Sequence, residues 1–430
     1  MRKNIYSIAL AAVGATLLSI SAQAQNGGAT RGAGRNPEPA AIPGRQCASM
    51  DVLNAQLAAD PTRGQRLEAI EAQTRRSIAS GQTRASFTAA GAVIVIPVVV
   101  HVLYNTAVQN ISDAQVQSQI DVLNEDFRKR NADATKTPSM FTGLVSDIGI
   151  EFRLATRTPL GAVTNGIIHK YTKTQSWGTN DAMKNSKRGG ADAWDTGKYL
   201  NIWACNLGQG LLGYAQFPGG AASTDGVVCL YSAFGSRAKA AGTYTNTYDL
   251  GRTTTHEVGH WLNLRHIWGD AACGNDLVSD TPTQQTSNYG CPTFPKVTCS
   301  NQGDMSMNYM DYTDDACMYM FSTGQSARMN ALFGSGGVRA SLLTSTGATA
   351  ATAGTAAALK LFPNPATDVL NLNAEAGAQV RVYSLQGAEM RQARYDGNGH
   401  LQVQSLPKGL YYVDVTDASG RTSHQRFEKE

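Results

Sequence analysis

The chain has 430 residues, of which 16% are charged, and its formal net charge at pH 7 is +4. This length predicts two to four domains. Because the net charge is small and no Lys/Arg cluster stands out, the sequence argues against a nucleic-acid partner. A charged fraction below the roughly 25% of an average soluble protein fits a secreted protein of ordinary polarity.

The N-terminus has the three parts of a secretory signal peptide. Residues 1–4 are basic, residues 5–20 are mostly apolar, and Ala22-Gln23-Ala24 has the small-residue pattern of a cleavage site. A transmembrane anchor is the alternative, but the apolar run is short and is interrupted by serine and glycine. We therefore expect residues 1–24 to be removed as a signal peptide.

Residues 25–85 are interpreted as a pro-segment. Residues 25–41 are rich in Gly, Asn, Arg and Pro, which predicts disorder, whereas residues 49–80 have helical spacing in a segment too polar to form a domain. Cys47 lies here, far from the other six cysteines. Candidate basic cleavage sites stand in or next to the polar stretch 77–86, at Arg75, Arg76 and Arg84.

Residues 86–340 alternate between strand and helix patterns. Residues 93–104 (VIVIPVVVHVLY) are too apolar for an exposed edge and are predicted to form a buried strand. Residues 112–131 are predicted to form a helix with Ser112 as its N-cap. Further strands are predicted at 150–156, 166–172, 198–205 and 225–231, and further helices at about 249–262 and at 323–333. This alternation predicts an α/β (α+β) domain with a twisted sheet.

The C-terminal part has a different pattern. Residues 341–357 are small and of low complexity, which predicts a linker. Residues 358–430 hold short alternating segments, such as 380–383 and 411–415, separated by turn sequences. They predict a small antiparallel β-sandwich. Because this module contains no histidine–carboxylate constellation, we expect it to serve in targeting or binding.

The strongest chemical signal is HEVGHWLNLRH, which holds three of the seven histidines. His256 and His260 are four residues apart, so a helix places both imidazoles on one face, where they can bind Zn²⁺. His266 joins them only if the chain turns, and Asn263 stands where the turn is needed. Asparagine enters the left-handed region more easily than other non-glycine residues. The alternative, a helix with core or surface histidines, is disfavoured by the third histidine.

Each role in zinc-dependent peptide hydrolysis has a candidate residue. Three histidine ligands would leave a coordination position for a water molecule of lowered pKa. Glu257 would take a proton from that water and pass it to the leaving amine. Downstream, in SMNYMDY (306–312), Met310 would pack beneath the histidines and Tyr312 would hydrogen-bond the oxyanion. Ordinary core packing is the alternative for Met310.

Three stretches, HEVGHWLNLRHIWGD, NYMDYTDDACMYMF and DGVVCLYSAFG, together resemble the pappalysin family of metzincin zinc endopeptidases, in particular its secreted bacterial members. The resemblance covers about residues 93–333. Asn263 departs from it, because most metzincins have glycine there. The resemblance implies a metzincin-type catalytic domain with an active-site helix, and a zinc endopeptidase in which these residues have the roles described above.

The resemblance also implies two disulfides in the irregular, cysteine-rich region after His266, namely Cys273–Cys299 and Cys291–Cys317. The sequence alone leaves three pairings open for these four cysteines. Cys205 and Cys229 lie on two predicted strands, where a third disulfide and two buried thiols are both consistent with the sequence.

Calcium near the site is a further implication of the resemblance. The stretch NDLVSDT (275–281) supplies hard oxygen ligands at short spacing, which suits Ca²⁺. The candidate ligands are Asp276 and Asp280, followed by Thr281 and the carbonyl of Val278. A polar loop without calcium is the alternative.

Specificity and latency each have candidate residues. Asp314 and Asp315 lie where, in this family, a loop shapes the pocket for the residue after the scissile bond, so an acid would favour Arg or Lys there. Solvated surface charges are the alternative. Cys47 resembles a cysteine switch, whose thiolate occupies the open zinc position. An unpaired thiol or an intermolecular disulfide is the alternative for Cys47.

The C-terminal module resembles the sorting domain of bacterial type IX secretion cargo. The matching features are LFPNP at 361–365, LPKGLY at 406–411 and the basic end at 421–429. The resemblance implies outer-membrane secretion machinery as a partner. It also implies a secreted or cell-surface location, reached through the periplasm and the outer membrane.

The sequence therefore predicts a secreted zinc endopeptidase, made as a zymogen, that acts on protein or peptide substrates. A secreted binding or adhesion protein with a vestigial metal site is the alternative from another class. It is disfavoured because the ligands, the general base and the turn that carries Met310 (residues 306–312, the Met-turn) are all intact. Another zinc hydrolase, such as an amidase or aminopeptidase, is disfavoured by the Met-turn.

Overall fold

The structure, a computed structural model, describes residues 44–81, 93–349, 359–374, 378–384, 388–416 and 422–430. The expected signal peptide, the expected disordered stretch 25–41 and Arg84 lie outside the described residues. Among the helices that the structure describes, none has the length and apolar character needed to cross a membrane.

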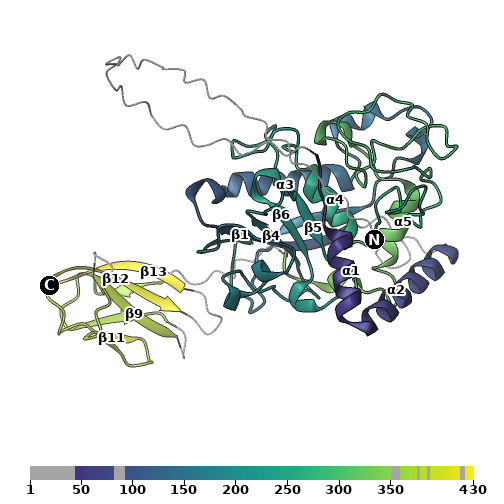
Figure 1. Ribbon diagram of the computed structural model, residues 1–430. Coiled ribbons are helices and arrows are strands. Elements are labelled where there is room, and N and C mark those ends of the chain that lie inside the picture. The colour runs from purple at the N-terminus through teal and green to yellow at the C-terminus, as the bar shows by residue number, and fades with distance from the viewer. Residues whose placement is uncertain (1–43, 82–92, 350–358, 375–377, 385–387, 417–421) are drawn as a thin grey trace, which may run out of the picture. The chain divides into compact units, whose positions relative to one another are not determined.

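A six-stranded sheet forms the centre of residues 93–349, the central domain (Figure 1). Its strands run in the order β2-β1-β4-β6-β5, and β3 pairs with the second half of β1. All pairs are parallel except β5–β6. The strands are β1 (Ile94–Tyr104), β2 (Ile150–Leu154), β3 (Ile167–Tyr171), β4 (Leu200–Cys205), β5 (Gly213–Ala215) and β6 (Val227–Leu230).

The five expected strands are confirmed. Most of the side chains of β1 are buried, as expected for a parallel strand with neighbours on both edges. The short antiparallel edge strand β5 was not expected, because three residues are too few for a period-two pattern.

Three helices of the central domain match expected segments. α3 (Asp113–Phe127) packs near β2 and begins as expected, with the Ser112 hydroxyl accepting a hydrogen bond from the Gln115 amide. α5 (Thr323–Ala331) begins with a reciprocal capping box between Ser322 and Gln325. α4 (Arg252–Trp261) is buried along its whole length and packs on β5 and β6. It begins about three residues later than expected, where the Leu250 and Arg252 amides donate hydrogen bonds to the Asp315 carboxylate.

The N-terminal segment (residues 44–81) forms two helices in place of the one expected helical stretch. α1 (Ser49–Ala59) and α2 (Pro61–Ala79) are separated at Asp60, whose side chain accepts a hydrogen bond from the Thr62 amide as the N-cap of α2. Proline at the first position of α2 suits this start. Arg75 and Arg76 consequently lie within α2, and the polar stretch expected from residue 77 is helical through residue 79.

The region of residues 266–320 is largely irregular, as expected, and contains both disulfides that the family resemblance implied. Cys273 bonds Cys299 and Cys291 bonds Cys317.

The third disulfide considered, between Cys205 and Cys229, is not formed. Both cysteines have free, buried thiols. β4 and β6 are neighbours, but Cys229 is paired with Ala204, and Cys205 with Leu230. This offset of one residue directs the two cysteine side chains to opposite faces of the sheet.

The C-terminal module contains two antiparallel sheets, as expected (Figure 1). Leu370, Leu372 and Leu401 of one sheet share a core with Val382, Val413 and Phe427 of the other. The first sheet has the order β10-β11-β8-β7 and the second β13-β12-β9. The strands are β7 (Leu361–Phe362), β8 (Val369–Leu372), β9 (Gln379–Ser384), β10 (Arg394–Tyr395), β11 (His400–Gln402), β12 (Gly409–Thr416) and β13 (Thr422–Lys429).

Candidate active site

Three imidazoles converge at the end of α4. His256 and His260 are one turn apart on the helix, and Asn263, with φ of 70°, turns the chain so that His266 joins them. The Nε2 atom of His260 lies 3.1 Å from Nε2 of His256 and 3.1 Å from Nε2 of His266. The left-handed conformation expected for Asn263 is thus confirmed.

The outer nitrogen of each imidazole has a hydrogen-bond acceptor. Nδ1 of His256 lies 2.7 Å from the Tyr309 carbonyl, Nδ1 of His260 lies 2.8 Å from the Leu264 carbonyl, and Nδ1 of His266 lies 2.5 Å from the Asp270 carboxylate. These acceptors place the protons on Nδ1, so the three Nε2 lone pairs face one another.

This donor set fits a zinc ion. Burial holds the pKa of His256 and of His260 well below the ordinary value, which keeps these rings neutral and able to ligate. The sulfur of Cys47 joins the three imidazoles, and the ligand atoms of all four residues lie within 4.8 Å of one another. Nitrogen and sulfur donors in a four-membered set are typical of Zn²⁺.

Glu257 is buried beside this cluster. Its carboxylate accepts hydrogen bonds from the Ser49 hydroxyl at 2.9 Å and from the Cys47 thiol at 3.3 Å. Burial raises the pKa of Glu257 to about 7, although these two donors favour the charged form. Gly213 leaves room for it, since a Cβ there would lie 2.9 Å from the Glu257 side chain. Ser49 and Gly213 were missed in the sequence because neither belongs to a local motif.

Met310 packs directly under the metal helix. A Cβ at Gly259 would lie 2.5 Å from the Met310 sulfur, so a larger residue here would displace the Met310 side chain. The Met310 carbonyl accepts a hydrogen bond from the Ile267 amide, next to His266. Sequence reasoning identified Met310 but gave no role to Gly259, although Gly259 lies inside the HEVGH motif.

Tyr312 lies among the histidine rings, with its centroid 4.9 Å from that of His266. Its hydroxyl donates to the Cys47 carbonyl at 3.3 Å, and burial raises its pKa. Trp268 stacks on His266, at 4.4 Å between ring centroids, and also contacts Tyr312 edge-on at 4.8 Å. Trp268 and Asp270 both orient His266, and both were overlooked in the sequence.

Asp315 and Asp314 have different environments. Asp315 is fully buried, and its carboxylate binds the Arg45 guanidinium at 2.6 Å, whereas Asp314 is only partly buried. Arg45 also donates to the Thr253 hydroxyl at 3.0 Å and to the Thr313 carbonyl at 3.3 Å. The structure therefore brings Asp315, and not Asp314, to a basic side chain of the N-terminal segment.

The N-terminal segment reaches the histidines by extending the sheet. The Leu212 amide donates to the Gln46 carbonyl, and the Ala48 amide donates to the Gly213 carbonyl. Cys47 is thereby held parallel to the edge strand β5. The regular main-chain pairing explains how a single cysteine far away in sequence is placed beside the three histidines.

Three of the candidate calcium ligands, Asp276, Val278 and Thr281, hydrogen-bond one another, whereas Asp280 binds the start of α5. The Asp276 carboxylate accepts from the Thr281 hydroxyl at 2.9 Å and from the Val278 amide at 3.1 Å. The Val278 carbonyl also accepts from the Thr281 hydroxyl. The Asp280 carboxylate accepts from Ser322 and Gly324 at the start of α5. Calcium binding at this loop stays a prediction.

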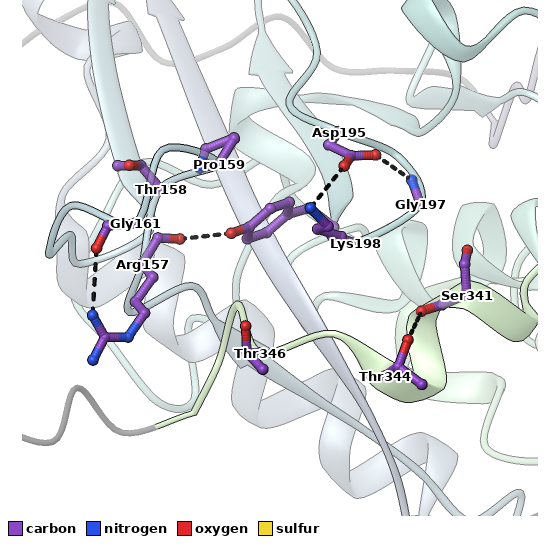
Figure 2. Close-up of a pocket in the computed structure, with 11 residues that line it drawn as sticks. Arg157, Thr158, Pro159, Gly161, Asp195, Gly197, Lys198, Ser341, Thr344 and Thr346 are labelled. Carbon is purple, nitrogen blue, oxygen red and sulfur yellow. Dashed lines mark hydrogen bonds and ion pairs between the residues drawn. The ribbon is translucent and has the colours of Figure 1, made fainter. Parts of the chain in front are cut away.

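A separate pocket of about 350 Å³ lies next to the 157–161 turn and the 340–344 turn (Figure 2). Its polar lining includes Arg157 and an exposed ion pair between Lys198 and Asp195. None of the candidate site residues lines it.

Comparisons with known proteins agree with this geometry. Residues 184–334 match the family model described as pregnancy-associated plasma protein-A, and residues 360–427 match the model of a secretion system C-terminal sorting domain. An extracellular metalloprotease of Pyricularia oryzae is 33% identical over 275 residues, which cover 62% of this chain and 85% of that relative. Extracellular metalloprotease 1 of Coccidioides posadasii is 35% identical over 234 residues, or 52% and 70% of the two chains.

Solved structures are similar over the same domain. Mature mirolysin of Tannerella forsythia in complex with a cleaved peptide is 53% identical, with a TM-score of 0.57, and the match covers 59% of this chain and 96% of that chain. A promirolysin mutant of the same organism is 47% identical, with a TM-score of 0.63, and covers 70% and 97%.

Proposed function

This chain belongs to the pappalysin family of metalloproteases, and from that premise we propose that it is a zinc endopeptidase made as a zymogen. The observation that carries the proposal is the convergence of three imidazole Nε2 atoms and the Cys47 sulfur beside the buried Glu257. The sorting domain marks the protein for export through the outer membrane. Its substrates are proteins or peptides.

His256, His260 and His266 would hold the zinc. When bound, Zn²⁺ would polarise the scissile carbonyl and lower the pKa of a water molecule. Asp270 and the carbonyls of Tyr309 and Leu264 keep the imidazoles in the ligating tautomer.

Glu257 would be the general base. Its pKa of about 7 suits a group that takes a proton from water and returns it to the leaving amine. The Tyr312 hydroxyl, which donates to the Cys47 carbonyl in this structure, would donate to the oxyanion of a bound substrate. Met310 would support the site through its contact with α4.

Cys47 would keep the zymogen latent by occupying the position needed by water. Burial and the neighbouring Glu257 carboxylate raise the pKa of the Cys47 thiol. A divalent cation held by the histidines would oppose this effect and favour the thiolate. Ser49 would contribute to latency as well, because its hydroxyl engages Glu257 at 2.9 Å.

Substrates would carry Arg or Lys after the scissile bond. Arg45 supports this preference, since its guanidinium lies in a buried site formed by Asp315, Thr253 and the Thr313 carbonyl. A carboxylate that binds the Arg45 guanidinium in the zymogen would bind a basic substrate side chain in the same place once the pro-segment has left. Asp314 is the weaker candidate, because it is more exposed.

Replacement of Glu257 by alanine tests the catalytic proposal. In activated protein, Glu257→Ala should lower kcat/KM for a peptide substrate by about 100- to 10,000-fold, because the general base is lost. Zinc content, measured by atomic absorption, should stay near one ion per chain. Chelation should abolish cleavage by the parent, and added Zn²⁺ should restore it.

The exposed Asp121 on α3 provides the control, because Asp121→Ala removes a surface carboxylate that is not part of the histidine cluster. It should cleave as fast as the parent. Cleavage by Glu257→Ala at the parental rate would reject the assigned base. An activated parent that cuts no protein substrate would favour the binding or adhesion alternative.

A further inference from the structure

A buried ionic contact joins the proposed pro-segment to the central domain away from the histidines. Glu71, in the middle of α2, accepts hydrogen bonds from the Arg328 guanidinium at 2.8 and 3.1 Å and from the Asn263 side-chain amide at 2.9 Å. The Arg328 side chain is 2% exposed and that of Glu71 is 8% exposed.

Asn263 serves both the metal-binding turn and this contact. Its left-handed backbone turns the chain toward His266, while its side chain reaches α2. Arg328 also donates to the Asn263 carbonyl at 3.1 Å, so the turn and the guanidinium support each other. A glycine at residue 263 would keep the turn but would remove the amide donor to Glu71.

Polar contacts dominate the attachment of α2. Its five buried residues are Arg63, Ile70, Glu71, Thr74 and Ser77, so a single one is apolar. Arg63 donates to the carbonyls of Phe217 and Pro218 at one end of the helix. With so little apolar surface buried, the attachment depends on the charged groups, and an unpaired buried charge is strongly destabilising.

We propose that Arg328 and Asn263 form a carboxylate-binding site on the central domain, which receives Glu71 and anchors the pro-segment without the metal. The inference rests on the proposed zymogen function. Latency then has two separate supports, because Glu71 is 24 positions after Cys47 and makes no contact with the zinc ligands. The second support holds α2 when the sulfur is not bound to the metal.

Hydrogen exchange of the full chain tests this anchor. A Glu257→Ala background prevents self-cleavage, and a chelator removes the support that depends on the metal. Glu71→Gln should then increase the exchange rate of α2 amides at least about tenfold, because a neutral amide leaves Arg328 without its ionic partner. Asn263→Gly should increase it less, since the Arg328–Glu71 pair remains.

The matched control is Glu68→Gln, which neutralises an exposed glutamate one turn earlier on the same helix. It should leave exchange at the parental rate, as should β1 amides in every variant. Equal exchange of α2 in the Glu71→Gln and Glu68→Gln chains would overturn the anchor. So would an equal effect of Glu71→Gln when Arg328 is already replaced by methionine, because coupled residues must be non-additive.

These measurements do not depend on catalysis. If the activated parent failed to cleave proteins, the proposed protease function would be rejected, while the exchange data would still report whether Glu71 is anchored. Conversely, an active parent with unchanged α2 exchange in the Glu71→Gln chain would reject the anchor alone.

Discussion

The Asp315 carboxylate makes two sets of contacts at once, one through each oxygen. One oxygen binds Arg45, and the other accepts hydrogen bonds from the Leu250 and Arg252 amides where α4 begins. The unpaired amides at a helix start need acceptors, so these two hydrogen bonds orient the carboxylate. The same acid thus helps to set the start of the metal helix and offers a charged partner to a basic side chain.

Asp315→Asn should reduce cleavage of a peptide with arginine after the scissile bond about 30-fold or more, because a buried charge pair is lost. A matched peptide with leucine at that position should be affected much less. The comparison uses kcat/KM for both peptides with the activated enzyme. Equal losses for the two peptides would point to a general defect of α4 and would contradict a specificity role.

Asp311 connects the irregular region to the Met-turn. Its carboxylate accepts hydrogen bonds from the Asn288 amide and side chain, the Gln284 side chain and the Tyr312 amide. Burial nevertheless raises the pKa of Asp311 to about 6 from the ordinary value of 3.8. A pKa raised by folding contributes stability that is complete below the unfolded pKa and is lost as pH rises through the folded pKa.

Asp311→Asn should therefore gain stability relative to the parent as pH rises. Between pH 4 and pH 7 the difference in free energy of unfolding should shift by up to about 3 kcal/mol in favour of the variant. Urea unfolding of both chains in a Glu257→Ala background measures it. Because any constant cost of the amide cancels across the series, parallel pH profiles would show that Asp311 does not titrate in this range.

At the scale of elements, the edge strand β5 joins the N-terminal segment to the central sheet. It is only three residues long, yet it pairs with β6 on one edge and with the main chain around Cys47 on the other. Gly213 in this strand leaves space for Glu257 behind it. Three contacts attach the N-terminal segment to the central domain in chain order. They are the Arg45–Asp315 ion pair, the main-chain pairing around Cys47 and the proposed Glu71 anchor.

Cys47→Ala should give a full-length chain that cleaves peptide substrate before any activation. Loss of only about 1.4 kcal/mol of pro-segment affinity corresponds to a tenfold rise in the open fraction, so an increase of at least about tenfold is expected. Initial rates before the first detectable processing on a gel measure it.

Gln46→Ala is the control for this experiment, because the Gln46 side chain is exposed while its carbonyl makes the strand pairing. It should remain latent. If Cys47→Ala were equally latent, the sulfur would have no inhibitory role and the remaining contacts of the segment would suffice.

At the scale of the whole molecule, the sheet and its helices support a long irregular region that depends on cross-links. Both disulfides lie in it, and each joins cysteines 26 positions apart. A region with few regular elements has little backbone order of its own, so closing these loops restricts mainly the unfolded chain.

Replacing Cys273 and Cys299 together by alanine should lower the free energy of unfolding by about 3.5 kcal/mol, the value expected for a loop of this length. Denaturant unfolding of the Glu257→Ala chain measures the change, and mass spectrometry should show the Cys291–Cys317 bond intact. A loss below about 0.5 kcal/mol would mean that this region keeps its conformation without the first cross-link.

Local patterns were sufficient for much of this protein. The apolar periodicity predicted the five expected strands and the main helices. The spacing of His256, His260 and His266 predicted the three imidazoles that converge, because each of these features depends on neighbours within a few residues. The chain turn at Asn263 belongs to the same class, since the backbone preference of asparagine is local. Family motifs added the disulfide pairing, which spacing alone left open.

Other features depend on which segments the fold brings together. Three such features are the short strand β5, the absence of a bond between Cys205 and Cys229, and the ion pair of Arg45 with Asp315. They follow from register and burial, which no local pattern encodes. The partnership of Asn263 with Glu71 joins residues 192 positions apart. Asn263 stands where most metzincins have glycine, and its backbone preference alone explains only why it is tolerated there. The tertiary structure gives its side chain a partner, because packing places Glu71 of α2 next to the turn at Asn263.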